Sequence, residues 1–173
     1  MQTTTLINIH RPGLMAPLLA QPGHESGPLS PGEHNDASRP QQATALPTVL
    51  LVEDNHINQV VALEFLALMG VQSRLAKNGL EAVSLCLESP PDLVLMDIQM
   101  PGMDGLECAR RLRELQREGQ LPAFPILALT AHALEADVLA SMDAGMDEHL
   151  TKPLDFVALR TRLHRWLKLP GLN

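Results

Sequence analysis

Six residues suited to binding or group-transfer chemistry directly follow short apolar segments of the chain. They are Glu53 and Asp54 after 48–52, Asp97 after 93–96, Thr130 after 126–129, and Lys152 and Pro153 just after the weaker segment 148–150. Parallel strands bring their carboxyl ends to one edge of a sheet, where open α/β folds bind ligands. If these segments are parallel strands, the six residues share one site.

The three carboxylates of this set predict a metal. At ~4 Å and an effective dielectric of ~20, each pair of carboxylates repels by about 4 kcal/mol. A hard divalent cation relieves that repulsion, and Mg²⁺ accepts one or two carboxylates together with water and phosphate oxygens. Asp104 reads differently, because it directly precedes an amphipathic run and suits a helix cap. We therefore expect Mg²⁺ and a phosphoryl guest near Asp97.

The segments that carry and separate these residues alternate between strands and helices. A parallel sheet that positions the site needs this alternation. Strands are predicted at 48–52, 71–76, 93–96, 126–129 and 148–150, and helices at 57–69, 80–87, 106–118, 134–144 and 155–167. Gly70 and Gly145 are placed as helix stops and Asn78 as a helix start. Five β/α units in succession imply an α/β fold with a parallel sheet covered on both faces.

Composition limits the classes of function. The chain has 173 residues, 45% of them hydrophobic, and a formal net charge of −7. Nucleic-acid binding is not expected, because it needs clustered Lys and Arg, and the arginines of 110–117 alternate with glutamates. No run approaches the ~20 apolar residues of a membrane span. Cys86 and Cys108 lack metal-ligand spacing and are expected as reduced, half-buried thiols, which suits a cytoplasmic protein.

The first 46 residues differ from the rest of the chain. They are rich in Pro, Gly, Ser, Gln and Asn, and such a segment buries too little apolar surface to offset its ordering entropy. We expect a disordered tail or linker at 1–46, one domain at 47–169 and a C-terminal tail at 170–173. Because only one helix fits after Pro153, any effect must act through a partner or a larger protein of which this chain is a piece.

Four motifs give the globular part a family resemblance: LLVEDN, LVLMDIQMPGMDG, ILALTA and HLTKP. Together they resemble the receiver domain of two-component response regulators, and EDNHINQ and TAHA resemble the receivers of hybrid sensor histidine kinases. The resemblance implies a CheY-like, flavodoxin-like doubly wound sheet of five parallel strands, order 2-1-3-4-5, with five helices.

The resemblance also implies roles for the site residues. Asp97 would be the phosphoacceptor; Glu53, Asp54 and the Gln99 carbonyl would hold Mg²⁺ with it. Thr130 and Lys152 would contact the phosphoryl group, with a cis peptide bond between Lys152 and Pro153. His149 stands where receivers usually have an aromatic switch residue, so the switch through Thr130 and His149 is expected in altered form. The chain would assist its own phosphorylation and dephosphorylation rather than act as an enzyme on other molecules.

A partner surface is expected on the helix at 57–69. At 100° per residue, Asn58, Val61, Ala62, Phe65 and Met69 share the face expected to pack on the sheet, which leaves Ile57, Val60 and Leu63 as an apolar docking patch. The expected partners are a sensor histidine kinase, a histidine phosphotransfer protein, or both. Two other functions are alternatives. A receiver-fold adaptor without regulated phosphorylation gains nothing from clustered acids, and a haloacid-dehalogenase-like phosphatase needs an acid where the chain has Gln99.

Overall fold

The computed structural model describes residues 45–171, and within them strands and helices alternate as expected. The strands are β1 (Thr48–Val52), β2 (Gln72–Ala76), β3 (Leu93–Asp97), β4 (Ile126–Thr130) and β5 (Glu148–Thr151). The helices are α1 (His56–Leu68), α2 (Gly79–Glu88), α3 (Gly105–Arg117), α4 (Glu135–Asp143) and α5 (Phe156–Trp166). The predicted boundaries agree with these to within one residue.

All five strands form one parallel sheet in the order β2-β1-β3-β4-β5, which confirms the predicted topology. The central strands β3 and β4 are buried along their whole length, which explains why they read as continuous apolar runs rather than alternating ones. In the register of the sheet, Asp97 lies opposite Leu129 and Thr130 lies opposite Thr151. The ends of β3, β4 and β5 are therefore level.

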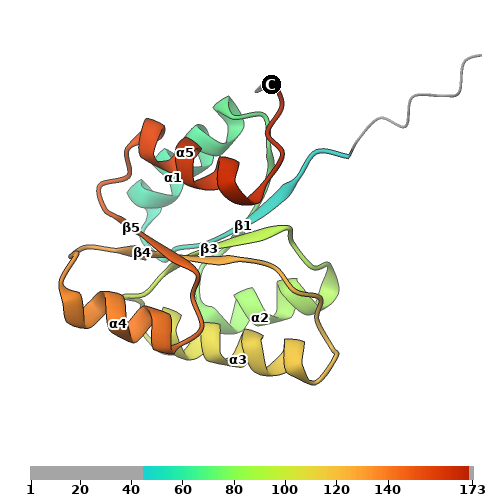
Figure 1. Ribbon diagram of the computed structural model, residues 1–173, viewed down its shortest axis with the longest axis vertical. Helices are drawn as coiled ribbons and strands as arrows, with labels where there is room; N and C mark the ends of the chain where they lie inside the picture. The colour runs from blue at the N-terminus through green and yellow to red at the C-terminus, as the bar shows by residue number, and fades with distance from the viewer. Residues whose placement is uncertain (1–44, 172–173) are drawn as a thin grey trace, which may run out of the picture. The chain divides into compact units, whose positions relative to one another are not determined.

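Two apolar cores lie on the two faces of the sheet, and Figure 1 shows the helices that cover them. Helices α1 and α5 cover one face, where Leu66 and Leu159 are among the fully buried side chains. Helices α2, α3 and α4 lie on the other face, where Leu112 and Leu115 of α3 are buried. Both faces being covered is what a parallel sheet requires.

Local signals in the sequence set the helix ends. The Asn78 side chain accepts a hydrogen bond from the Glu81 amide, and Asp104 accepts one from the Glu107 amide, so both are N-caps as expected. Gly70 and Gly145 follow the ends of α1 and α4 with φ of +72° and +93°, which only glycine adopts at little cost. Among the helices of residues 45–171, none has both the length and the apolarity needed to cross a bilayer.

The predicted buried face of α1 was partly wrong. Leu66 and Gln59 are buried, whereas Val61 is 38% exposed, and Leu63 is half-buried against the core instead of lying on an exposed patch. Apolar residues occur all around this helix, so their periodicity does not select a face. The two cysteines are fully buried, not half-buried. The tail predicted at 1–46 lies outside the described residues except for Ala45 and Leu46, which are exposed coil.

Candidate phosphoacceptor and metal site

Three carboxylates converge at the carboxyl edge of the sheet, as the strand ends predicted. Glu53 and Asp54 follow β1 and Asp97 ends β3, and one oxygen from each of the three lies within 4.8 Å of the others. Asp97 and Glu53 are each only 1% exposed, whereas Asp54 is exposed. The cluster therefore has a buried floor of two acids and one acid at its mouth.

Lys152 supplies the positive charge that this cluster needs. Its Nζ lies 3.1 Å from Glu53 Oε2 and 3.1 Å from Asp97 Oδ2, bridging the two buried carboxylates. The Lys152 amide donates to the Thr130 carbonyl at 2.7 Å, which ties the lysine to the end of β4. The Lys152–Pro153 peptide bond is cis, as expected. The lysine, which follows β5, thus joins the ends of β1, β3 and β4 at the site.

Backbone amides orient the two buried acids. The Gln99 amide donates to Asp97 Oδ1 at 3.0 Å, and the Asn55 amide donates to Glu53 Oε1 at 3.0 Å. The buried Gln59 side chain donates from Nε2 to the Glu53 carbonyl at 2.8 Å, so α1 is fastened to the end of β1. Sequence reasoning missed Gln59; its only signal was a polar residue one turn before Ala62 on a helix face that faces the sheet.

Burial dominates the protonation of Asp97. Removal from water raises the pKa of Asp97 to about 6, and the Glu53 charge adds to this, while the Gln99 amide and Lys152 oppose it. Burial alone would lower the pKa of Lys152, but the Asp97 and Glu53 carboxylates outweigh it and hold that pKa above its usual value. The site therefore has a permanent ammonium beside a carboxylate that protonates in mildly acidic solution.

Thr130 is 2% exposed, and its hydroxyl is already engaged. It donates to the His132 carbonyl at 2.7 Å and accepts from the His132 amide at 3.2 Å. His149 is half-buried on β5, opposite Ala128 of β4. The Thr130 hydroxyl must give up its hydrogen bond to the His132 carbonyl before it can donate to a group bound at Asp97. The TAHA motif did not predict this hydrogen bond between Thr130 and His132.

The loop between β3 and α3 is held by a very close approach of two main chains. A Cβ on Gly105 would lie 2.1 Å from the Asp97 carbonyl oxygen and 2.7 Å from Ile98 Cα. Only glycine allows α3 to begin against the backbone of the central carboxylate. Gly105 is the glycine of the MDG motif, which marks a turn in the sequence. The motif alone does not show that Gly105 lies against the backbone of Asp97.

The cluster suits a hard divalent cation. Its three carboxylates lie within reach of one ion, and carboxylate oxygens are the ligands that Mg²⁺ prefers. Within residues 45–171, Lys152 is the only cation paired with these acids, and it balances a single charge of the three. Glu53, Asp54 and Asp97 therefore fit Mg²⁺ by ligand type and spacing, and the part expected of the Gln99 carbonyl stays a prediction.

An apolar pocket of about 170 Å³ lies beside Lys152, between α1 and the segment after β5. Ile57 and Val61 of α1 line it, opposite Pro153 and Leu154. Ile57 is 72% exposed and Val60 is 53% exposed, but Val60 does not line this pocket. Of the three residues predicted as a docking patch, Ile57 lies next to the site, Val60 lies on the exposed surface and Leu63 packs inward.

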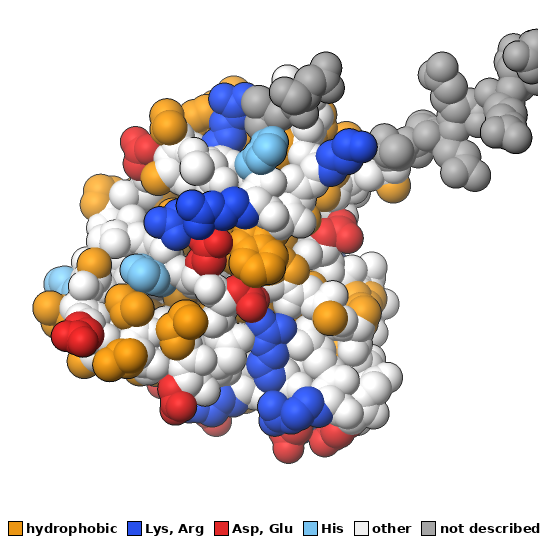
Figure 2. All heavy atoms as spheres, in the orientation of Figure 1, with side chains coloured by type: hydrophobic (Ala, Val, Ile, Leu, Met, Phe, Trp, Pro, Cys, Tyr) orange, Lys and Arg blue, Asp and Glu red, His pale blue; other side chains and the backbone are white. Residues whose placement is uncertain are grey.

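A second apolar surface covers α4. Leu134, Leu139 and Met142 are each more than half exposed, and Figure 2 shows hydrophobic side chains gathered over this helix near pale blue histidines. The helix buries little, because Ser141 is its one buried residue and Leu134 provides no side-chain cap. This surface lies on the opposite face of the sheet from α1 and α5 (Figure 1).

Known proteins are similar to this chain in sequence and in fold. The family model of the response regulator receiver domain matches the sequence over residues 49–164. The sensor histidine kinase GacS of Pseudomonas protegens is 37% identical over 138 residues, which are 79% of this chain and 15% of that protein. The peroxide stress-activated histidine kinase mak1 of Schizosaccharomyces pombe is 34% identical over an alignment of 166 residues that covers 86% of this chain and 10% of that protein. The chain thus spans about a tenth to a seventh of these relatives.

Two solved receiver domains have similar structures. One is the receiver of the response regulator Ssk1 from Saccharomyces cerevisiae, crystallised with the histidine phosphotransfer protein Ypd1; its TM-score is 0.66 at 34% identity, covering 70% of this chain and 90% of that one. The other belongs to a sensor histidine kinase of Pseudomonas aeruginosa and has magnesium in its active-site cleft, with a TM-score of 0.63, 36% identity, and coverage of 70% and 98%.

Proposed function

This chain belongs to the response regulator receiver domain family, and from that membership we propose that Asp97 accepts a phosphoryl group from phosphohistidine in a phosphorelay of the hybrid-kinase type. One observation carries the proposal: a buried carboxylate at the end of the central strand has an ammonium 3.1 Å away and two further acids beside it. That arrangement binds and neutralises a transferred phosphoryl group.

Each residue has a part in the transfer. An Asp97 oxygen bonds to phosphorus as the bond from phosphorus to the donor histidine breaks, which leaves an aspartyl phosphate and a free imidazole. Lys152 moves its ion pair from the carboxylates to the phosphoryl oxygens, and the Thr130 hydroxyl exchanges the His132 carbonyl for one of them. A Mg²⁺ ion held by Glu53, Asp54, Asp97 and the Gln99 carbonyl would neutralise the remaining charge. His149 responds to the movement of Thr130.

The test is chemical labelling of the 173-residue protein. With acetyl phosphate and Mg²⁺, its intact mass should rise by about 80 Da, one phosphoryl group. Asp97→Asn should abolish the gain. Asp104→Asn is the matched control, because Asn caps a helix as well as Asp does and the fold is kept. Full labelling of Asp97→Asn would refute the assignment, and no labelling of the wild type would favour the alternative, a receiver-fold adaptor.

The partner that we propose is a histidine phosphotransfer protein, or a sensor histidine kinase, docked on α1. Ile57 and Val61 expose apolar surface beside Lys152, so a partner seated there places its histidine near Asp97. Ile57→Asp should slow transfer from a phosphotransfer protein about tenfold or more, while acetyl phosphate labelling continues unchanged.

Val60→Asp measures how far this docking surface extends, because Val60 is exposed but lies outside the pocket beside Lys152. If Ile57→Asp and Val60→Asp both slow phosphoryl transfer from the phosphotransfer protein, the docking surface extends along α1 to Val60. If both variants accept phosphate at the wild-type rate, α1 is not the docking surface, and the partner would bind at α4 and His149 instead.

We also propose residues 47–169 as the limits of the receiver domain and the cytoplasm as its location. The last core residue near that limit is Leu169, 4% exposed. Cys86 and Cys108 are free and buried in the described part of the chain, and burial raises their pKa values to about 11 and about 12. Such thiols stay protonated and unreactive, as suits a reducing compartment.

A further inference from the structure

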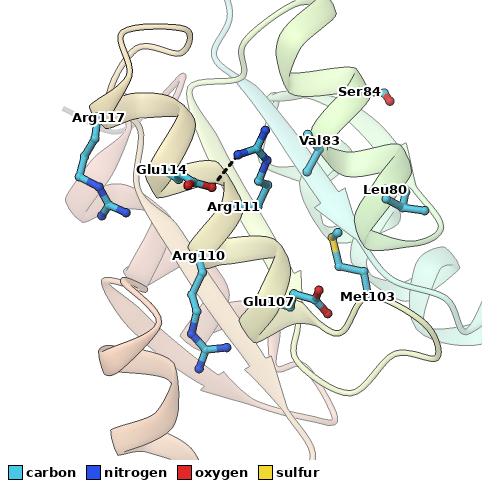
Figure 3. Close-up of a pocket in the computed structure, with 9 residues that line it drawn as sticks. All are labelled: Leu80, Val83, Ser84, Met103, Glu107, Arg110, Arg111, Glu114 and Arg117. Carbon is cyan, nitrogen blue, oxygen red and sulfur yellow. Dashed lines mark hydrogen bonds and ion pairs between the residues drawn. The ribbon is translucent and has the colours of Figure 1, made fainter.

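A groove of about 560 Å³ lies between α2 and α3, and Figure 3 shows the residues that line it. Both helices lie on the face of the sheet opposite α1 (Figure 1). The α2 side of the groove is apolar, with Leu80 and Val83, and its α3 side is charged. Met103, from the loop before α3, closes one end beside Leu80, as Figure 3 shows. The phosphoacceptor site uses none of these residues.

The charged side of the groove holds two exposed arginines that have no ion-pair partner among residues 45–171. Arg111 is paired with Glu114, with 2.6 Å between Nη1 and Oε2. Within residues 45–171, Arg110 and Arg117 make no ion pair, and both line the groove. They are seven residues apart, so they lie on the same side of α3, about 10.5 Å apart along its axis. The groove therefore offers two free guanidinium groups, two helical turns apart.

Arg113, the remaining arginine of α3, differs from Arg110 and Arg117 because its guanidinium group is engaged in hydrogen bonds. Arg113 points away from the groove and bonds the carbonyls of Gly145 and Phe124 and the carboxylate of Asp147, at 2.7 to 2.8 Å. Arg113 is a structural clamp, whereas Arg110 and Arg117 contribute nothing comparable to the fold.

The apolar side continues along α2 beyond the groove, to Leu87, which does not line it. Leu80 is 66% exposed and Val83 is half-buried; Leu87, one turn further along α2, is 47% exposed. These residues recur at i, i+3 and i+7, which is the spacing that meets the apolar face of another helix. The small Ser84 beside them leaves room for close approach. The apolar residues of α2 and the two arginines of α3 thus lie on either side of the Arg111–Glu114 pair (Figure 3).

We propose that this groove docks an acidic amphipathic helix of a partner protein. Its apolar side chains would pack on Leu80 and Val83, and two carboxylates seven residues apart would pair with Arg110 and Arg117. A lipid bilayer fits less well, because the surface is concave and the chain carries a net charge of −7. Nucleic acid fits less well too, because Glu107 and Glu114 stand in the same row as the arginines. The groove and α1 can be occupied at once.

The test uses a defined probe and the full chain. A fluorescent synthetic helix of about five turns carries leucines at i, i+3 and i+7 and two glutamates seven residues apart; a second peptide has lysines in place of both glutamates. The acidic peptide should bind the wild type, more weakly as salt increases, and R110E/R117E should weaken it about tenfold or more. The lysine peptide should prefer R110E/R117E to the wild type. Leu80→Asp should weaken binding of both peptides.

Arg160→Glu is the matched control, because Arg160 is an exposed arginine on α5, on the opposite face of the sheet. It should leave binding of the acidic peptide unchanged. Equal binding by wild type, R110E/R117E and Arg160→Glu would overturn the proposal, as would no binding at all. So would arginine-dependent sedimentation with phosphatidylserine vesicles, or self-association in ultracentrifugation that R110E/R117E abolishes, since the occupant would then be a membrane or a second copy.

Discussion

Replacing Gly105 by alanine should disable the phosphoacceptor without unfolding the protein. The new Cβ would lie 2.1 Å from the Asp97 carbonyl oxygen, while ordinary contact begins near 3.4 Å, so one main chain must move by about 1.3 Å. Both nearest groups are backbone, so no side-chain rotation relieves the clash. A misplacement of about 1 Å costs roughly 100-fold in rate, and overpacking costs about 1–3 kcal/mol of stability.

Gly119→Ala is the matched control for this effect. Gly119 follows the other end of α3 with φ +75° and has nothing within 4 Å of an added Cβ, so its replacement costs about 1–2 kcal/mol of backbone strain without a clash. Initial rates of labelling by acetyl phosphate, with thermal unfolding of both variants, separate the effects. Labelling of Gly105→Ala within threefold of Gly119→Ala would show that this contact does not position Asp97.

Three further perturbations test the site and the fold that supports it. Without Mg²⁺, the pKa of Asp97 near 6 lies above the usual 3.8, so this carboxyl stabilises the fold below pH 4 and the contribution is lost as pH rises through 6. Asp97→Asn should therefore raise the unfolding free energy by about 1–3 kcal/mol at pH 7 and by little at pH 4; equal shifts at both pH values would contradict the raised pKa. Asp54→Ala should weaken Mg²⁺ binding and slow labelling while leaving the fold as stable or more so, and an unchanged Mg²⁺ titration would remove Asp54 from the site. Arg113→Met should cost about 2–4 kcal/mol in denaturant unfolding, because it strips partners from Asp147 and two carbonyls, whereas Arg111→Met should cost under about 0.5 kcal/mol.

The sequence predicted the sheet and the position of the acid cluster well, because local chemistry determines both. Gly70, Asn78 and Asp104 mark helix ends through their own backbone preferences and caps. The acids fall where strands end, and a parallel sheet then brings them together whatever the packing details are.

The sequence failed where the outcome depended on packing. In α1, Leu66 and Val61 are equally apolar, and only contact with the sheet decides that Leu66 is buried and Val61 exposed. The lysine bridge was missed for a related reason. The acids were expected to rely on a metal for relief, but side-chain direction brings Lys152 between Glu53 and Asp97.

The lysine bridge has a consequence for the order in which the protein is built. Lys152 and Glu53 are 99 residues apart in sequence, so their pairing closes one of the longest loops in the domain. During synthesis the amino-terminal part of a chain emerges first, and Lys152 follows β5, the last strand. Until that strand joins the edge of the sheet beside β4, the clustered acids have no countercharge. If Asp97 accepts phosphate as proposed, a nascent or truncated chain ending before Lys152 would carry the acceptor without the ammonium 3.1 Å from it, and should label poorly with acetyl phosphate.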